Sequence, residues 1–167
     1  MLGRMAGLNV RRIGGKFRDG DHIWNTITYA DGKTYCVDVT QDDSNYFRKD
    51  INRYIFFNAP LEVVQSTHQY PWEAITNLQR NIDNRYSYCC LTNHAQASSA
   101  EKGLKLIAQK IGKEKFSLFS VMAPYDERFS EANKEQNKNY VRRAAGKNID
   151  VYTVQFGKYL FFTGVLS

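Results

Sequence analysis

The chain has 167 residues, of which 43% are hydrophobic and 14% aromatic, a composition that excludes a disordered protein and suits one good core or two small ones. No stretch has the apolar length needed to cross a bilayer, and residues 1–15 carry charges where a signal peptide has its apolar core, so we expect a cytoplasmic protein without a membrane partner. Of the net charge of +6, residues 86–167 hold +5 (twelve Lys and Arg against seven Asp and Glu) and residues 1–85 hold +1 (eleven against ten), which would favour an anionic partner for the second half.

The first elements are short. Residues 2–7 read as one helical turn ended by Gly7, and residues 8–13 read as a strand closed by a pair of glycines. A helix of one turn cannot be held by its own hydrogen bonds, so we expect another surface to cover it. A polar loop over residues 16–21 then leads into the next strand.

Residues 22–29 and 33–40 predict a β-hairpin. Both segments are rich in β-branched and aromatic residues, and the turn-forming Ala30-Asp31-Gly32 lies between them. A three-residue loop with Gly32 in the left-handed conformation is a common connection. It pairs Tyr29 with Lys33.

Counting back along this register places Trp24 opposite Asp38. One face of the hairpin then carries His22, Trp24, Cys36, Asp38 and Thr40. His22 lies diagonally across from Asp38, within reach of a small adjustment. A histidine oriented by a carboxylate supplies two of the three groups in a nucleophile, base and orienter triad.

The residues of this hairpin also resemble a known family. The stretch His22-x-Trp24-Asn25, followed by Asp31-Gly32-Lys33-x-Tyr35-x-Val37-Asp38-Val39-Thr40 and Asp42-Asp43, is similar to the second half of a bacterial transglutaminase-like domain, related in fold to papain-type cysteine peptidases. The resemblance runs from about Gly7 to about Trp72. It implies that His22 is the base and Asp38 the orienter for a cysteine at the start of an upstream helix.

The sequence departs from the family at the nucleophile. Residues 2–15 look like the end of the family's long helix and the strand before the histidine, so the nucleophilic cysteine would lie on residues that this sequence does not have. We expect Cys36 to be a core residue, because no helix N-terminus lowers the pKa of a thiol in that strand. His22 and Asp38 would then be a vestigial base and orienter, with Trp24 as a packing residue and a candidate binding anchor.

Residues 41–85 complete the first domain. Residues 54–57 predict an apolar, central strand, and residues 61–65 predict a helical turn. Residues 68–72 resemble the aromatic, histidine-containing tail of the bacterial family, with His68 as a polar surface or capping residue. We expect a domain over residues 1–73 and a linker over residues 74–85.

Residues 86–167 predict a small α/β domain of order β-α-β-α-β-β. Strands are expected over residues 86–91, 116–121, 150–156 and 159–165. A helix begins at the capping box Ser98-x-x-Glu101 and buries Leu104, Ile107, Ala108 and Ile111, and a more polar helix covers residues 129–145 and ends at Gly146. The whole chain is therefore expected to be an α+β protein, with a truncated transglutaminase-like antiparallel β core before this domain.

The three cysteines predict no disulfide framework and no metal site. Cys89 and Cys90 are adjacent, the count is odd, and only His94 lies nearby, which does not match the ligand spacing of zinc sites. Reduced thiols in the core are expected, with His94 as a polar surface or capping residue. We expect neither a metal nor a cofactor.

The more polar helix offers a candidate basic ridge. Its cations are Lys134, Lys138, Arg142 and Arg143, and some of them recur at helical spacing. Such a ridge could contact a nucleic-acid backbone. A solvated helix face is the simpler interpretation, because no nucleic-acid motif accompanies the charge.

We favour a catalytically inactive transglutaminase-like protein, a pseudoenzyme that binds or inhibits another protein, as a phage or other mobile element could carry. An initiator Met and a complete second domain fit a finished protein, and a homodimer is possible. The alternative is a fragment of an enzyme that acts on peptide or protein acyl groups by thioester chemistry, and a second alternative is a basic nucleic-acid-binding protein. Removing most of the nucleophile's helix predicts an apolar groove beside Trp24, filled by a partner, a second copy or the second domain.

Overall fold

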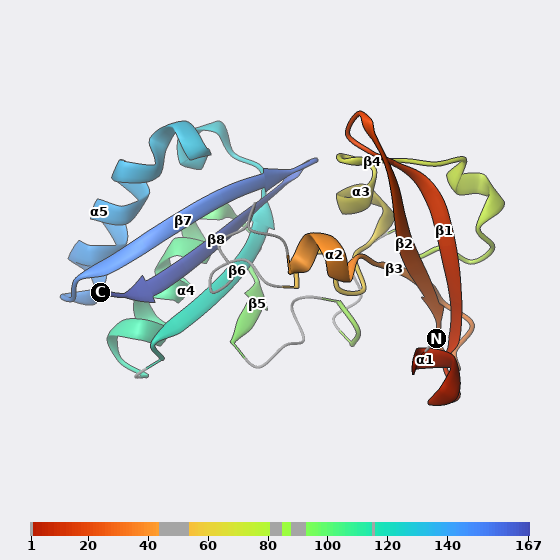
Figure 1. Ribbon diagram of the computed structural model, residues 1–167. Coiled ribbons are helices and arrows are strands. Elements are labelled where there is room, and N and C mark those ends of the chain that lie inside the picture. Colours follow the sequence, from red (N-terminus) through yellow and green to blue (C-terminus); the bar gives the residue numbers. More distant parts are fainter. Residues whose placement is uncertain (1, 44–53, 81–84, 88–92, 115) are drawn as a thin grey trace. The chain divides into compact units, whose positions relative to one another are not determined.

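The computed structural model describes residues 2–43, 54–80, 85–87, 93–114 and 116–167 (Figure 1). These residues form two compact units, the first containing the described residues up to 87 and the second those from 93 onward. Each unit has its own four-stranded sheet, so the chain is a mixed α+β protein as expected. Among the described residues, no helix combines the length and the apolar character needed to cross a membrane.

The first unit is built on a long antiparallel hairpin. Its elements are α1 (Leu2–Met5), β1 (Asn9–Phe17), β2 (Gly20–Thr28), β3 (Thr34–Val37), α2 (Val39–Asp42), α3 (Leu61–Val64), β4 (His68–Gln69) and the 3-10 turn η1 (Trp72–Ala74). The strand order is β3-β2-β1-β4. The predicted loop over residues 16–21 is wrong, because β1 continues through Phe17 and pairs Lys16 with Asp21. The turn is confined to residues 18–19, where Arg18 has a φ of 54°.

The β2–β3 hairpin has the predicted register. The Tyr29 backbone N–H donates to the Lys33 carbonyl at 3.0 Å, and Gly32 has a φ of 79°. The predicted strand over residues 33–40 is too long, however, since β3 ends at Val37. Asp38 instead caps α2, because its side chain accepts a hydrogen bond from the Gln41 N–H. Thr40 consequently lies on a helix and not on the strand face.

The predicted central strand over residues 54–57 is also wrong. Residues 54–58 form turns, with a positive φ at Tyr54 (78°) and Asn58 (49°), and only Ala59 makes a bridge to Cys36. The buried Asp42 carboxylate accepts the Phe56 N–H at 2.8 Å, and the Phe56 carbonyl accepts the Asp38 N–H at 3.2 Å, so a side chain and a backbone group bond to this apolar segment in place of a ladder. The helical turn predicted over residues 61–65 is confirmed by α3.

Residues placed in the predicted linker contact the first sheet. The Gln79 N–H donates to the Thr34 carbonyl at 2.7 Å, and the Thr34 N–H donates to the Asn77 carbonyl at 3.0 Å. These bonds cover the outer edge of β3, which would otherwise be an unpaired edge strand.

From α4 onward the second unit matches the predicted order of elements. It comprises β5 (His94–Gln96), α4 (Ala100–Gly112), β6 (Leu118–Pro124), the 3-10 turns η3 (Glu127–Phe129) and η4 (Glu131–Asn133), α5 (Lys134–Ala145), β7 (Ile149–Phe156) and β8 (Tyr159–Leu166). The sheet order is β5-β6-β8-β7, with β5 and β6 parallel and the other pairs antiparallel. The N-cap of α4 is Ser99 and not Ser98, and α5 begins at Lys134 because 3-10 turns replace its predicted first residues. The strand expected over residues 86–91 is not β5: Tyr86 and Ser87 are turn and bend residues of the first unit, and residues 88–91 lie outside the described residues.

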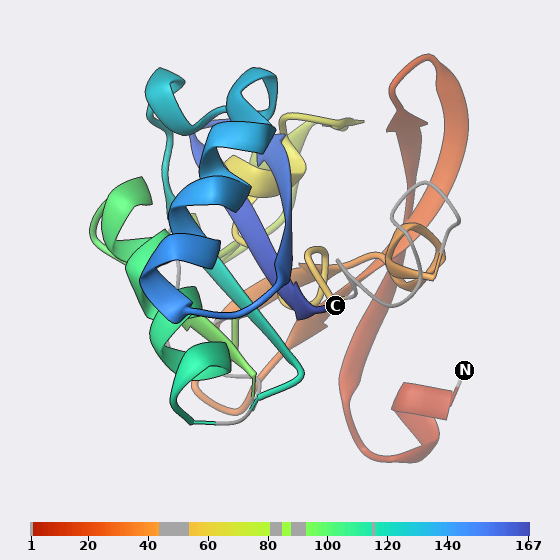
Figure 2. The same cartoon turned by 90° about the vertical axis from the view of Figure 1, so that its left-hand side faces the viewer.

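Both helices of the second unit pack on its sheet (Figure 2). The predicted stripe of α4, which is Leu104, Ile107, Ala108 and Ile111, is buried in a core shared with Val121, Val141 and Phe162. Gly146 ends α5 with a φ of 66°, as its left-handed C-cap position requires. The spacing of apolar residues in the sequence thus predicts the buried face of α4 correctly.

Candidate functional site

Two histidines of the first unit share one carboxylate. His22 Nε2 lies 2.6 Å from Asp38 Oδ2, and His68 Nε2 lies 2.9 Å from the same oxygen. The expected contact between His22 and Asp38 is therefore confirmed. His68 joins them from a strand that the sequence alone did not connect to the pair.

The local structure explains how the three side chains meet. His22 lies on β2 opposite Gly15 of β1, and His68 on β4 pairs with Phe17 at the end of β1. Asp38 follows the last residue of β3, at the register position opposite Trp24. The strand order β3-β2-β1-β4 thus brings residues 30 positions apart in the chain to one end of the sheet.

Aromatic rings surround the carboxylate and the two imidazoles. The Phe17 ring lies 5.0 Å from the His68 ring, centroid to centroid, and the Trp24 ring lies 4.9 Å from it. His22 stacks on Trp24 at 6.1 Å with an interplanar angle of 18°. Such walls exclude water and strengthen the hydrogen bonds inside them.

The Asp38 carboxylate is held in its ionised form. Burial would raise the pKa of Asp38, but hydrogen bonds from His68, His22 and the Gln41 backbone N–H outweigh it and hold the pKa below its usual value. The side chain is only 3% exposed. An ionised carboxylate in this position can orient either imidazole and stabilise its protonated form.

A second buried carboxylate lies nearby and behaves in the opposite way. Burial, the main cause, raises the pKa of Asp42 to about 7, and the Asp38 charge adds to the rise against hydrogen bonds from the Phe56 and Tyr54 backbones. Asp42 is therefore partly protonated near neutral pH. Its carboxylate bonds to the turn over residues 54–58, and among the described residues it makes no hydrogen bond to either histidine.

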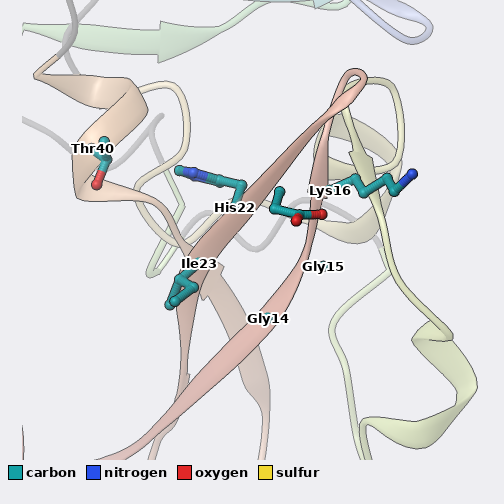
Figure 3. A pocket seen from close by; sticks show the side chains of 7 residues that line it. Gly14, Gly15, Lys16, His22, Ile23 and Thr40 are labelled. Atoms are coloured by element: carbon teal, nitrogen blue, oxygen red, sulfur yellow. The ribbon is translucent and has the colours of Figure 1, made fainter.

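The side chain of His22 reaches an open hollow of the surface. The hollow is lined by Gly14, Gly15, Lys16, Asp21, His22, Ile23 and Thr40. In Figure 3 the imidazole extends from β2 toward α2, which carries Thr40. With 14% of its side chain exposed and Nε2 bonded to Asp38, His22 can present its other ring nitrogen, Nδ1, to a molecule from solvent.

The interpretation of His68 as a surface or capping residue is wrong. Its side chain has no exposed surface, and besides Asp38 it contacts the Thr67 hydroxyl and the Val64 carbonyl through Nδ1, at 3.0 and 3.3 Å. The only sequence signal was its place in an aromatic segment, His68 to Trp72, which resembles a core segment more than a loop. Pairing of β4 with β1 is a long-range contact that periodicity in so short a strand cannot reveal.

Cys36 is a core residue, as expected. Burial is the main cause that raises the pKa of its thiol to about 12; the Trp24 indole opposes the rise and the Asp38 carboxylate adds to it. The Trp24 Nε1–H has no hydrogen-bond partner of ordinary geometry among the described residues, so its interaction with the sulfur is weaker than a formed hydrogen bond. Cys89 and Cys90 lie outside the described residues.

The described residues leave no apolar groove beside Trp24, contrary to the expectation. Trp24 is 1% exposed, and residues of its own unit cover it, with ring centroids of Tyr70 at 6.0 Å and Trp72 at 5.9 Å. The tail over residues 68–72 thus fills the place that we assigned to a partner. Trp24 therefore anchors the interior of the unit, and exposed apolar residues lie elsewhere.

The candidate basic residues of α5 are partly paired. Arg142 Nη2 lies 3.0 Å from Asp150 Oδ1, and Lys138 Nζ lies 3.5 Å from the same oxygen. Arg143 Nε donates to the Asn139 carbonyl at 3.4 Å, within the helix, whereas Lys134 lies at its first turn. The carboxylate of Asp150 therefore offsets part of the positive charge of this ridge. His94, expected at the surface, is half-buried on β5, where burial lowers its pKa to about 4.

Comparison of the chain with models of protein families, with curated proteins and with solved structures finds no match. The resemblance to transglutaminase-like domains is therefore an inference from the sequence of the two hairpin strands.

Proposed function

We propose that the chain is a transglutaminase-like protein that keeps the base and the orienter of the family's site but does not catalyse, and that it acts by binding another protein. The observation that carries the proposal is the combination at one site of a 2.6 Å contact between His22 and Asp38 with a buried Cys36 whose pKa is about 12. His22 and Asp38 together can accept a proton from a nucleophile. Cys36 cannot be that nucleophile, because its thiol is not ionised near neutral pH.

Exposed apolar side chains next to this site are the candidate binding surface. Ile23 is 54% exposed and Val39 is 63% exposed, and Ile23 lines the same hollow as His22. Val39 lines a second hollow together with Tyr54 and Phe57. Three exposed large apolar residues, Ile23, Val39 and Tyr54, thus line these two hollows, and such a group favours a protein partner.

Sedimentation of the purified chain tests the binding proposal in its simplest form, with a second copy as partner. If the surface around α2 binds, Ile23→Ser and Val39→Ser should each weaken any self-association at least about tenfold, since exposed anchors contribute binding energy without supporting the core. Lys134→Ala is the matched control on the other unit and should leave association unchanged. Association that is lost in Lys134→Ala and kept in both serine variants would contradict the proposal.

Catalysis is tested separately with a glutamine-containing peptide and an amine acceptor. We expect no release of ammonia above the rate in buffer. Release that disappears in His22→Gln would instead support the enzyme alternative, which the tight contact between His22 and Asp38 favours. The nucleic-acid alternative has less support, because Asp150 pairs with two of the cations that it needs.

A further inference from the structure

We propose that His22, Asp38 and His68 form a binding site for a divalent first-row transition metal ion, for which zinc is a suitable probe. The three ligand atoms, Nε2 of each histidine and a carboxylate oxygen of Asp38, all lie within 4.8 Å of one another. Two imidazoles and one carboxylate are a ligand set that zinc and iron sites use with a further position left for solvent or substrate. The inference does not rest on the proposed function, because a metal ion can bind whether or not a protein does.

Hydrogen bonds behind His68 favour metal binding at its Nε2. The Thr67 hydroxyl donates to the Val64 carbonyl at 3.4 Å, and Nδ1 of His68 lies 3.0 Å from that hydroxyl oxygen and 3.3 Å from that carbonyl oxygen. Both oxygens can accept a hydrogen bond from Nδ1. When a metal ion occupies Nε2, His68 can therefore keep its ring proton on Nδ1 and donate it to one of these oxygens. Metal-bound histidines commonly donate their other ring N–H to a carbonyl or carboxylate in this way.

A metal ion would take the place of the proton between His68 and Asp38. Nε2 of His68 and Oδ2 of Asp38 face each other across a hydrogen bond of 2.9 Å. Binding of the ion releases the proton of that bond, as is usual at histidine and carboxylate ligands, and it also takes His22 as a ligand.

The distances require a small rearrangement of the site. Zinc bonds of about 2.0–2.1 Å in a tetrahedral arrangement place neighbouring ligand atoms about 3.3 Å apart. The observed separations of 2.6 and 2.9 Å from the Asp38 oxygen are shorter by less than an ångström. His22 can supply the movement, since its imidazole lies at the open hollow, whereas His68 and Asp38 are fixed by burial. The hollow also gives an ion a path of entry and a place for a bound water.

Calorimetric titration of the full chain with zinc at pH 7.5 tests the proposal. We expect one zinc per chain with a dissociation constant in the micromolar range or below. His22→Gln should weaken binding at least about 100-fold, because loss of a ligand costs more than loss of the group that orients it. His94→Gln, in the second unit, is the matched control and should bind as the unaltered chain does. The same titration in a chain with Cys89→Ser and Cys90→Ser checks for binding by the thiols.

A second measurement needs no substitution in the buried part of the site. Zinc added to the unaltered chain should shift the ring nitrogen signals of His22 and His68 in a nitrogen-15 spectrum and leave those of His94 in place. The proposal is overturned if these two signals do not move, if zinc binds no more tightly than about 1 mM, or if affinity survives in His22→Gln and falls in the serine double variant.

Discussion

At the residue scale, Asp38 holds the site together. Two imidazoles and one backbone N–H converge on its carboxylate, and it is buried among aromatic rings. Removing the carboxylate would leave its hydrogen-bond partners buried without their acceptor. The sequence indicated this residue because a carboxylate within an apolar strand pair needs a partner. It did not indicate His68, the second partner, because nothing local connects a two-residue strand to β1.

Asp38→Asn should lower the free energy of unfolding at pH 7 by about 2–4 kcal/mol, as expected for a buried, hydrogen-bonded carboxylate. The pKa of Asp38 is lowered in the folded state, so its contribution is present above the unfolded pKa of about 3.9 and is lost as pH falls through the folded pKa. Urea unfolding at pH 7 and at pH 3 measures both. An Asn variant that is destabilised equally at the two values would contradict the ionised, hydrogen-bonded state.

Asp42→Asn should show the opposite dependence on pH. Because the folded pKa is raised to about 7, the folded state binds more protons than the unfolded state between about pH 4 and pH 7, and stability falls as pH rises through that range. The difference in unfolding free energy should therefore move in favour of the variant over this range, by a few kcal/mol at about 1.36 kcal/mol per pKa unit. Thermal or urea unfolding at pH 4.5 and pH 7.5 tests this, and a difference that is constant with pH would rule it out.

At the element scale, the β1–β2 hairpin positions the histidine through a close approach at Gly15. A Cβ on Gly15 would lie 2.7 Å from Trp24 Cη2 and 2.5 Å from the Gln69 carbonyl oxygen, so a side chain there would displace β4 or the indole. The adjacent Gly14 has no heavy atom within 4 Å of such a Cβ. The pair of glycines was interpreted from the sequence as the end of a strand, whereas one of them makes room for the tryptophan.

Gly15→Ala should destabilise the chain by about 1–3 kcal/mol, the usual effect of overpacking a rigid site. Gly14→Ala is the matched control and should change the free energy of unfolding by less than about 1 kcal/mol. The imidazole signals of His22 and His68 should shift in the first variant and not in the second. Equal effects of the two substitutions would contradict the packing of Trp24 against β1.

Elements with a clear period were predicted well, and elements without one were not. The buried stripe of α4 and the strands β7 and β8 follow directly from the spacing of apolar residues. Residues 54–57 are apolar throughout, and such a run fits a buried turn as well as a strand. Its structure depends on Asp42, a side chain about a dozen positions earlier, which no local pattern reports.

At the scale of the whole molecule, the chain is two compact units, and the candidate site lies within the first. The expectation of an uncovered groove failed because the chain's own segment 68–72 packs on Trp24, which illustrates that an apolar face left by one element is commonly covered by another. Among the described residues, segment 68–72 covers the site on the side of Trp24, and the hollow beside His22 opens to the surface.

The proposed function requires that the first unit hold a base and an orienter without a reactive thiol, and the alkylation rate of each cysteine tests this most directly. At pH 7 a thiol with a pKa of about 12 is ionised in about one molecule in 100,000, so iodoacetamide should label Cys36 at least about 100-fold more slowly than a free thiol. Peptide mass spectrometry resolves Cys36 from Cys89 and Cys90, and we expect none of the three to react faster than a free thiol. Rapid labelling of any one of them that is lost in His22→Gln would contradict the account, since the histidine would then activate a nucleophile within this chain.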